Sequence, residues 1–226
     1  MLHDPVPNKL PFPLSYYNPT TGVKKKGGAY EAIGQLGLYY GLAAGDLIAS
    51  LRWSNTDYAM LITGFGVRLS CPVAFTTPQF VGVMSYKALG LTTDATGGTD
   101  IKSIFGTPRR TIMGAPKIAG VQAATASPAA PGHTPLTHGT RTGLSNVIFG
   151  QSAYTGAAAN INDPGVYLDL PIANAKPIFV EANEGFEIQN AVALPVAYTA
   201  GCLSIQLILD WLEIPTEIVD QYFSSF

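Results

Sequence analysis

Charged residues are scarce in this chain of 226 residues. Asp, Glu, Lys and Arg make up 12% of it, against roughly 25% in an average soluble domain. The net charge of −2 provides no overall positive field that could gather phosphates, and the short basic clusters Lys24–Lys26 and Arg109–Arg110 are typical of solvated turns. We therefore expect no nucleic-acid partner. A weakly charged surface is suited to lying against another protein, because few ions lose their water on contact.

Cysteine and histidine are also rare. Cys71 and Cys202 lie far apart, each within a predicted strand, and we expect buried apolar thiols rather than a disulfide or a metal pair. The histidines are His3, His133 and His138, and the spacing of the last two within a Pro/Thr/Gly loop matches no compact zinc motif. These observations predict no metal site and no cofactor.

Motifs that carry catalysis are missing as well. The chain has no Gly-x-Ser-x-Gly elbow, no phosphate loop ending in Gly-Lys-Ser/Thr and no calcium loop. Glu181, Glu184 and Glu187 are spaced by three, which would gather them on a helix, but the predicted strand–turn–strand scatters them and puts Glu184 in the turn. We therefore expect a protein that is not an enzyme.

Membrane and export signals are not found either. The N-terminus lacks the charged region and apolar stretch of a signal peptide. The uncharged run 188–209 is long enough to raise the question of a membrane span, but Pro195 and Gly201 break it. We interpret the run as a hairpin and expect no membrane contact.

What the sequence does contain is period-two hydrophobicity. Leu47, Ala49, Leu51 and Trp53 alternate with Ile48, Ser50 and Arg52, and a polar turn at 54–57 follows. Further strands are predicted over 60–70, 80–87, 178–182 and 186–194, with a turn at 183–185 between the last two. The clearest pattern is the final one, in which five apolar positions alternate from 203 to 211 before Pro215 ends the strand.

These short strands predict an all-β protein with an antiparallel, jelly-roll-like β-sandwich. We expect an extended Pro-rich N-terminal arm over 1–28, the sandwich over 29–214 and a C-terminal tail over 215–226. Residues 88–160, rich in Ala, Gly, Pro, Thr and Ser, are expected to form long loops that join short strands. Residues 29–45 stay unassigned, because three glycines interrupt their helical pattern.

Both ends of the chain carry apolar and aromatic residues. Five prolines in the first 22 residues favour an extended arm, yet aromatic side chains lie among them, unlike in a purely disordered tail. The arm is equally compatible with docking on a neighbouring subunit and with folding over its own domain. The candidate residues for subunit contact at the two ends are Leu10, Phe12, Leu14, Tyr16, Tyr17, Tyr222, Phe223 and Phe226.

Four segments, taken in order, resemble small virion structural proteins of tailed bacteriophages. They are Leu-Arg-Trp-Ser-Asn-Thr-Asp-Tyr-Ala-Met-Leu-Ile at 51–62; Ala-Phe-Thr-Thr-Pro-Gln-Phe at 74–80 with Thr-Gly-Gly-Thr at 96–99 and Arg-Arg-Thr-Ile-Met at 109–113; Leu-Thr-His-Gly-Thr-Arg-Thr at 136–142; and Ala-Asn-Glu-Gly-Phe-Glu-Ile at 182–188, running to Asp-Trp-Leu-Glu at 210–213. The resemblance covers about residues 46–214. The Pro-rich arm and the segment after Pro215 are outside this pattern.

The resemblance implies a structural protein located in the virion and assembled in the host cytoplasm. Its first expected role is a capsid decoration or cement subunit, a homotrimer that contacts itself and the major capsid or other virion proteins. A tail, neck or fibre-associated protein, or a small jelly-roll shell protein, is the alternative. A carbohydrate-binding module is more distant, with Tyr154 and Tyr167 as the aromatics that would stack on sugars.

Overall fold

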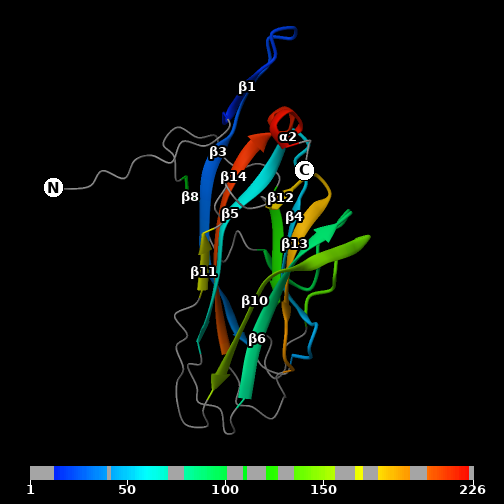
Figure 1. The fold of residues 1–226 in the computed structure, drawn as a ribbon. Helices are drawn as coiled ribbons and strands as arrows, with labels where there is room; N and C mark the ends of the chain where they lie inside the picture. Colours follow the sequence, from blue (N-terminus) through cyan, green and yellow to red (C-terminus); the bar gives the residue numbers. More distant parts are fainter. Residues whose placement is uncertain are drawn as a thin grey trace, which may run out of the picture.

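A computed structural model of the chain describes residues 13–39, 42–70, 79–100, 109–110, 121–126, 135–155, 166–169, 178–193 and 203–223. They form an all-β fold in which two antiparallel sheets pack against each other, as the sequence predicts (Figure 1). The jelly-roll refinement of that expectation stays a prediction. Within the described residues, no helix is long and apolar enough to cross a membrane.

The two sheets are named here after one of their central strands. The β6 sheet consists, in spatial order, of β10 (Gly143–Thr155), β6 (Gln79–Leu89), β13 (Glu184–Asn190), β4 (Leu47–Trp53), β9 (Val121–Ala126) and β7 (Gly98–Asp100). The β14 sheet consists of β11 (Val166–Asp169), β5 (Tyr58–Ser70), β14 (Leu203–Pro215), β3 (Gly28–Tyr39) and β8 (Arg109–Arg110), with β12 (Ile178–Val180) also paired to β5.

The main core fills the space between the sheets. Alternate residues of β14 point into it, as the period-two pattern predicts: Ile205 and Trp211 are buried in this cluster. Phe65 of β5 and Phe186 of β13 meet across the two sheets edge to face, with ring centroids 4.9 Å apart. Within the β14 sheet, Trp211 stacks on Tyr30 at 5.8 Å. The core therefore joins the sheets through aromatic contacts as well as aliphatic packing.

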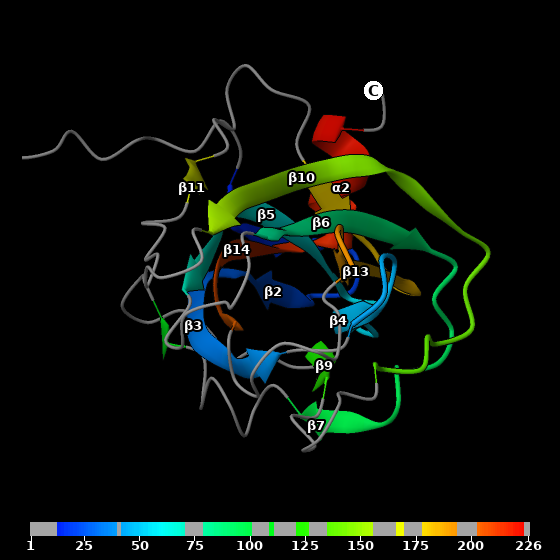
Figure 2. The ribbon, with the colours of Figure 1, turned by 90° about the horizontal axis from the view of Figure 1, so that it is seen from below.

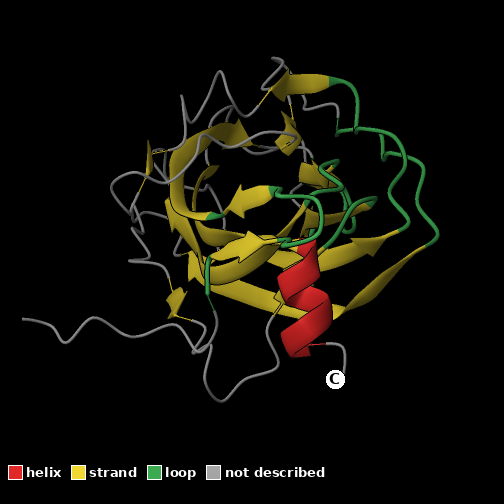
Figure 3. Ribbon diagram, turned by 90° about the horizontal axis from the view of Figure 1, so that it is seen from above, coloured by secondary structure: helices red, strands yellow, loops and turns green. Residues whose placement is uncertain are grey.

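A second, smaller core lies at one end of the fold. Leu61, Leu212 and Ile214 turn away from the main core and pack against Ile218 and Val219. These last two residues belong to α2 (Thr216–Phe223), the helix that directly follows β14. Figure 3 shows α2 beside the strands at this end. The helix thus covers apolar side chains of β5 and β14 that are not part of the main core.

The N-terminal segment forms a two-stranded hairpin at the same end. β1 (Ser15–Tyr17) pairs antiparallel with β2 (Lys24–Lys26), and Tyr16 lies opposite Lys25. The tip of this hairpin projects beyond the strands of both sheets (Figure 1). Part of the arm expected at 1–28 is therefore folded, and residues 1–12 lie outside the described part of the chain.

Three segments differ from what the sequence predicts. Residues 143–155, assigned to loops between short strands, form the 13-residue strand β10, which pairs along β6. The unassigned segment 29–45 contributes β3, which lies against β14 despite its glycines. Residues 216–223 of the predicted tail form α2. β10 and β3 each gain their partner strand from a distant part of the chain, which local patterning does not report, whereas α2 packs in part against the strand that it directly follows.

We predict that replacing Phe186 by alanine lowers the free energy of unfolding by about 3–5 kcal/mol, because it removes a buried ring that joins the two sheets. Urea unfolding followed by intrinsic fluorescence measures the loss. Tyr17→Ala, at a side chain that is 59% exposed, is the control and should change stability by less than about 0.5 kcal/mol. Equal losses in the two variants would contradict this description of the core.

Candidate interaction surface

The two ends of the described chain meet at one end of the sandwich. Leu14 and Tyr16 of the hairpin pack against the same small core that contains Ile218 and Val219 of α2. Of the two possibilities for the arm, folding over its own domain therefore holds for these two side chains. Leu10, Phe12 and Phe226 lie outside the described residues, and the side chain of Phe223 is likewise outside them.

The exposed part of this surface is apolar and cationic. Tyr17 is 59% exposed, Val23 48% and Tyr222 43%, which are high values for such large side chains. Lys24 and Lys26 are exposed beside them, and residues 13–28 contain no Asp or Glu. The hairpin tip thus presents exposed apolar side chains next to Lys24 and Lys26, whereas the carboxylates of Asp57 and Glu217 lie at its base on Lys25. A protein surface with acidic side chains around an apolar area would complement the tip.

Local sequence accounts for the shape of the hairpin tip. The side-chain oxygen of Asn18 accepts hydrogen bonds from the backbone N–H groups of Thr20 at 2.9 Å and Thr21 at 3.2 Å. Gly22 adopts a positive φ of 69°, which favours glycine, and its N–H donates to the Asn18 carbonyl at 2.8 Å. The Asn18 N–H donates to the Val23 carbonyl at 2.9 Å, so the turn is closed by its own backbone.

The base of the hairpin is held by one lysine. Lys25 Nζ lies 2.9 Å from Asp57 Oδ1 and 2.8 Å from Glu217 Oε1, which ties β2 to the start of β5 and to α2. Burial opposes the charged form of Lys25, but the hydrogen bonds and charges of the two carboxylates outweigh it, and the pKa of Lys25 is raised. At Gly27 an added Cβ would lie 2.0 Å from the Glu213 carbonyl oxygen, so only glycine allows this close approach.

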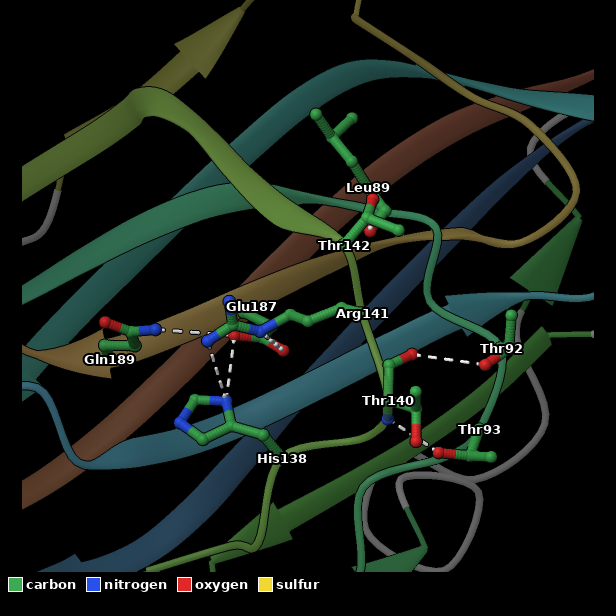
Figure 4. A network of polar contacts seen from close by, with 9 residues as sticks. All are labelled: Leu89, Thr92, Thr93, His138, Thr140, Arg141, Thr142, Glu187 and Gln189. Atoms are coloured by element: carbon green, nitrogen blue, oxygen red, sulfur yellow. Dashed lines mark hydrogen bonds and ion pairs between the residues drawn. The ribbon is translucent and has the colours of Figure 1, made fainter.

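A second group of polar residues lies on the outer face of the β6 sheet. On β13, Phe186 and Ile188 point into the main core, so Glu187 between them faces outward. Glu187 is nevertheless fully buried, because the segment 135–142 crosses this face and covers it. Figure 4 shows His138 and Arg141 of this segment converging on the carboxylate.

The contacts of Glu187 are ionic and polar. Arg141 Nε lies 3.2 Å from Oε1, His138 Nδ1 lies 3.2 Å from Oε2, and the Gln189 amide donates to Oε2 at 3.4 Å. A guanidinium partner offsets the cost of burying this carboxylate. The group therefore anchors the segment 135–142 to the sheet. Sequence analysis missed this role, although a glutamate flanked by core residues within a strand was a signal for it.

Threonines hold the same segment along its other side. The Thr140 N–H donates to Thr93 Oγ1 at 2.7 Å, and the Thr92 N–H donates to the Thr140 carbonyl at 2.8 Å. The Thr142 hydroxyl donates to the Leu89 carbonyl at 2.9 Å. The side chain of His138, which the sequence places in a loop, is 37% exposed and contacts Glu187.

The other glutamates of the 181–187 stretch have separate contacts, and Glu184, which was predicted in the turn, lies in a strand instead. Glu184 opens β13 and pairs with Lys87 at 2.7 Å, while the exposed Glu181 donates its backbone N–H to Glu184 Oε2 at 2.8 Å. The turn occupies 181–183, ahead of the predicted 183–185, and Asn183 adopts a positive φ of 65° there. Among the residues that the structure describes, no group of three or more His, Cys, Asp or Glu could hold a metal ion.

Comparison of the chain with protein-family models, curated proteins and solved structures finds no match.

We predict that Glu187→Gln lowers the free energy of unfolding by roughly 1–3 kcal/mol, because it leaves the partly buried guanidinium of Arg141 without its counter-charge. Amide hydrogen exchange over 136–142 should accelerate at the same time. Glu184→Gln, on the same strand, is the matched control and should cost about 1 kcal/mol or less, since its ion pair with Lys87 is more exposed. Unchanged exchange in the Glu187 variant would contradict the anchoring role.

A further carboxylate is buried without an ionic partner among the described residues. Glu213 of β14 is 2% exposed, its Oε1 atom has no hydrogen-bond partner in the described part of the chain, and burial raises its pKa to about 8. The folded state therefore holds this proton more tightly than the unfolded chain, in which the glutamate has its ordinary pKa of about 4.3.

From this pKa we predict a pH dependence of stability. The contribution of Glu213 is fully present below about pH 4 and is lost as the pH rises toward 8, because the unfolded chain then releases a proton that the folded chain keeps. Relative to wild type, Glu213→Gln should gain on the order of 2–4 kcal/mol of stability between pH 5 and pH 8. Urea titrations of both proteins at several pH values measure the difference. A pH-independent difference would show that Glu213 titrates normally.

Proposed function

We propose that this chain is a structural, non-enzymatic subunit of a tailed-bacteriophage virion, with decoration or cementing of the head as its first location. The observation that carries the proposal is the projecting hairpin, which exposes Tyr17 and Val23 next to Lys24 while its base is fixed to the domain by Lys25. An anchored element with an uncovered apolar edge is suited to docking on a neighbouring protein.

The positions of the resembling segments support this proposal. Arg52 of the first segment has its Nε atom 2.5 Å from Asp94 Oδ1, and the Thr96 and Thr137 backbones of the second and third segments are hydrogen bonded. His138 and Arg141 of the third segment contact Glu187 of the fourth. The shared pattern thus consists of residues that hold the sandwich together, as expected of a common scaffold whose individual members dock through parts outside the pattern.

The hairpin and α2 are such parts. Both lie largely outside the resembling region, and both contribute exposed aromatic residues at one end of the fold. We infer that the hairpin contacts an acidic area of the major capsid protein or of another virion protein. Aromatic side chains with a cationic border are typical of protein–protein contacts that depend on a small number of anchoring residues.

Tail, neck or fibre location is the second candidate within the same class. The same projecting surface would serve there, and the number of copies per particle separates the two: hundreds of copies indicate the head, and about a dozen indicate the tail or neck. The carbohydrate-binding alternative depends on Tyr154 and Tyr167 as loop aromatics. Both tyrosines lie within strands, β10 and β11, so this observation does not favour that alternative.

The test reverses the charge of the hairpin. Lys24→Glu combined with Lys26→Glu should reduce binding to particles assembled without the chain by about tenfold or more, because the acidic partner would then repel the hairpin. Lys24→Arg with Lys26→Arg is the matched control and should bind like wild type. Co-sedimentation and quantitative mass spectrometry of the particles measure bound copies. Equal binding by both variants would remove the hairpin from the mechanism, and absence of the chain from purified virions would refute the proposed function.

A further inference from the structure

The strand β10 ends the β6 sheet with an open edge. Among the strands that the structure describes, it has a hydrogen-bonded neighbour on its β6 side alone, and Figure 2 shows it on the outside of β6. Natural proteins protect such edges with charges, prolines, bulges or short strands, because unpaired backbone groups invite another strand. β10 is 13 residues long and contains no Asp, Glu, Lys, Arg or Pro.

Bulges protect only the first part of this strand. The pairing of β10 with β6 has register shifts between Leu144 and Phe149, and from Phe149 to Thr155 it continues without interruption, each residue opposite the next residue of β6. An irregular strand turns its edge groups away from a partner, whereas a regular strand presents them in line. The stretch 149–155 is therefore a regular, uncharged edge that no other described strand covers.

The outer face beside this edge is apolar. Val81 and Val83 of β6 are buried in the main core, so Phe80 and Met84 lie on the opposite, outer face, where they are 57% and 37% exposed. The backbone register places Ser152 opposite Gly82, which lies between Phe80 and Met84 along β6. Pairing at the edge of β10 would thus be accompanied by burial of exposed apolar surface next to it.

The length and charge of the other edges indicate what pairs with β10. The remaining edge strands of the two sheets that the structure describes are β7 with 3 residues, β8 with 2, β11 with 4 and β12 with 3, and each of them except β12 contains a charged residue. None of them can cover a regular stretch of seven residues. A second β10 matches it in length, and because neither strand is charged, two copies meet without repulsion. The Lys24–Lys26 hairpin, in contrast, would repel its own copy.

We propose that β10 pairs antiparallel with β10 of a second copy of this chain, which joins the two β6 sheets into one continuous sheet. Full overlap of the stretch 149–155 places the two-fold axis at Ser152, so that Ser152 faces Ser152 of the second copy and Phe149 faces Thr155. Such a contact is isologous and closes as a dimer. It goes beyond the proposed function, and it is a two-fold contact where the resemblance implies a homotrimer.

Charge substitution at the axis tests this contact. Ser152→Lys places two lysines directly opposite each other, with Cβ atoms about 4.5–5.5 Å apart, and Ser152→Glu does the same with two carboxylates. Each variant alone should be a monomer by light scattering at a concentration where the wild type is a dimer. A mixture of the two variants should restore a dimer that contains one chain of each kind, because opposite charges then face each other.

Controls separate this contact from other effects. Thr56→Lys and Thr56→Glu, at an exposed turn position outside β10, should leave the dimer unchanged. Hydrogen exchange of wild-type amides over 149–155 should slow as the protein concentration rises, which gives a readout that needs no variant. A wild type that stays monomeric or forms a trimer, or variants whose mixture stays monomeric, would overturn the proposal.

Failure of this contact and failure of the proposed function give different results. The hairpin variants are scored by binding to particles, whereas the Ser152 variants are scored by the mass of the free protein. Particle binding by a monomeric wild type would reject the β10 contact and leave the structural role in place. If the wild-type dimer disappears with Ser152→Lys but the chain is found in no virion, the β10 contact stands and the proposed function is rejected.

Discussion

Burial of one face of each sheet is the constraint from which the rest of the structure follows. The two sheets present alternating apolar residues to each other, and the contact between Phe65 and Phe186 sets them face to face. Because side chains alternate along a strand, this packing decides which residues must be accommodated on the outside. Leu61, Leu212 and Ile214 are then covered by α2, and Glu187 by the segment 135–142. The helix α2 and the segment 135–142 thus cover side chains that the packing of the main core places on the outside of the sheets.

Several of the few charged residues of the chain form ion pairs within the fold. Arg52 with Asp94, Lys87 with Glu184, and Arg141 with Glu187 each join segments that are distant in sequence. These pairs fix the arrangement of loops on the sheets. The two partly exposed pairs contribute little to stability, whereas the pair with the buried Glu187 contributes more. The remaining surface is poor in charge, which lowers the cost of covering it with another protein.

The hydrophobic pattern of the sequence predicts the strands that have one face in the main core. It does not predict strands whose formation depends on pairing with a distant segment. The alternation in 203–211 and 47–53 marks β14 and β4, because both strands have one face in the main core. β10 contains the continuous run Val147, Ile148, Phe149 within Gly and Ser residues, and its pairing with β6 overrides that composition. α2 was detectable in principle, since Ile218, Val219 and Tyr222 are spaced for one helical face.

The candidate surface was predictable only in part, because a sequence does not show which of its aromatic side chains are buried by packing. The aromatic residues at the two chain ends were visible, but not that Leu14 and Tyr16 are turned inward while Tyr17 and Tyr222 are exposed. The Glu187 group joins residues more than forty positions apart, and a single sequence contains no information on that proximity. Three-dimensional contacts decide which of several similar side chains is available to a partner.

The way in which the hairpin is fastened has a consequence for its behaviour in solution. Its base depends on Lys25 between two carboxylates, one of which, Asp57, is 67% exposed at its side chain, whereas its inner side depends on apolar packing of Leu14 and Tyr16. Dissolved ions screen the first kind of attachment, and salts such as sulfate strengthen the second. The identity of the salt, beyond its concentration, therefore sets whether the projection swings about its base or stays fixed.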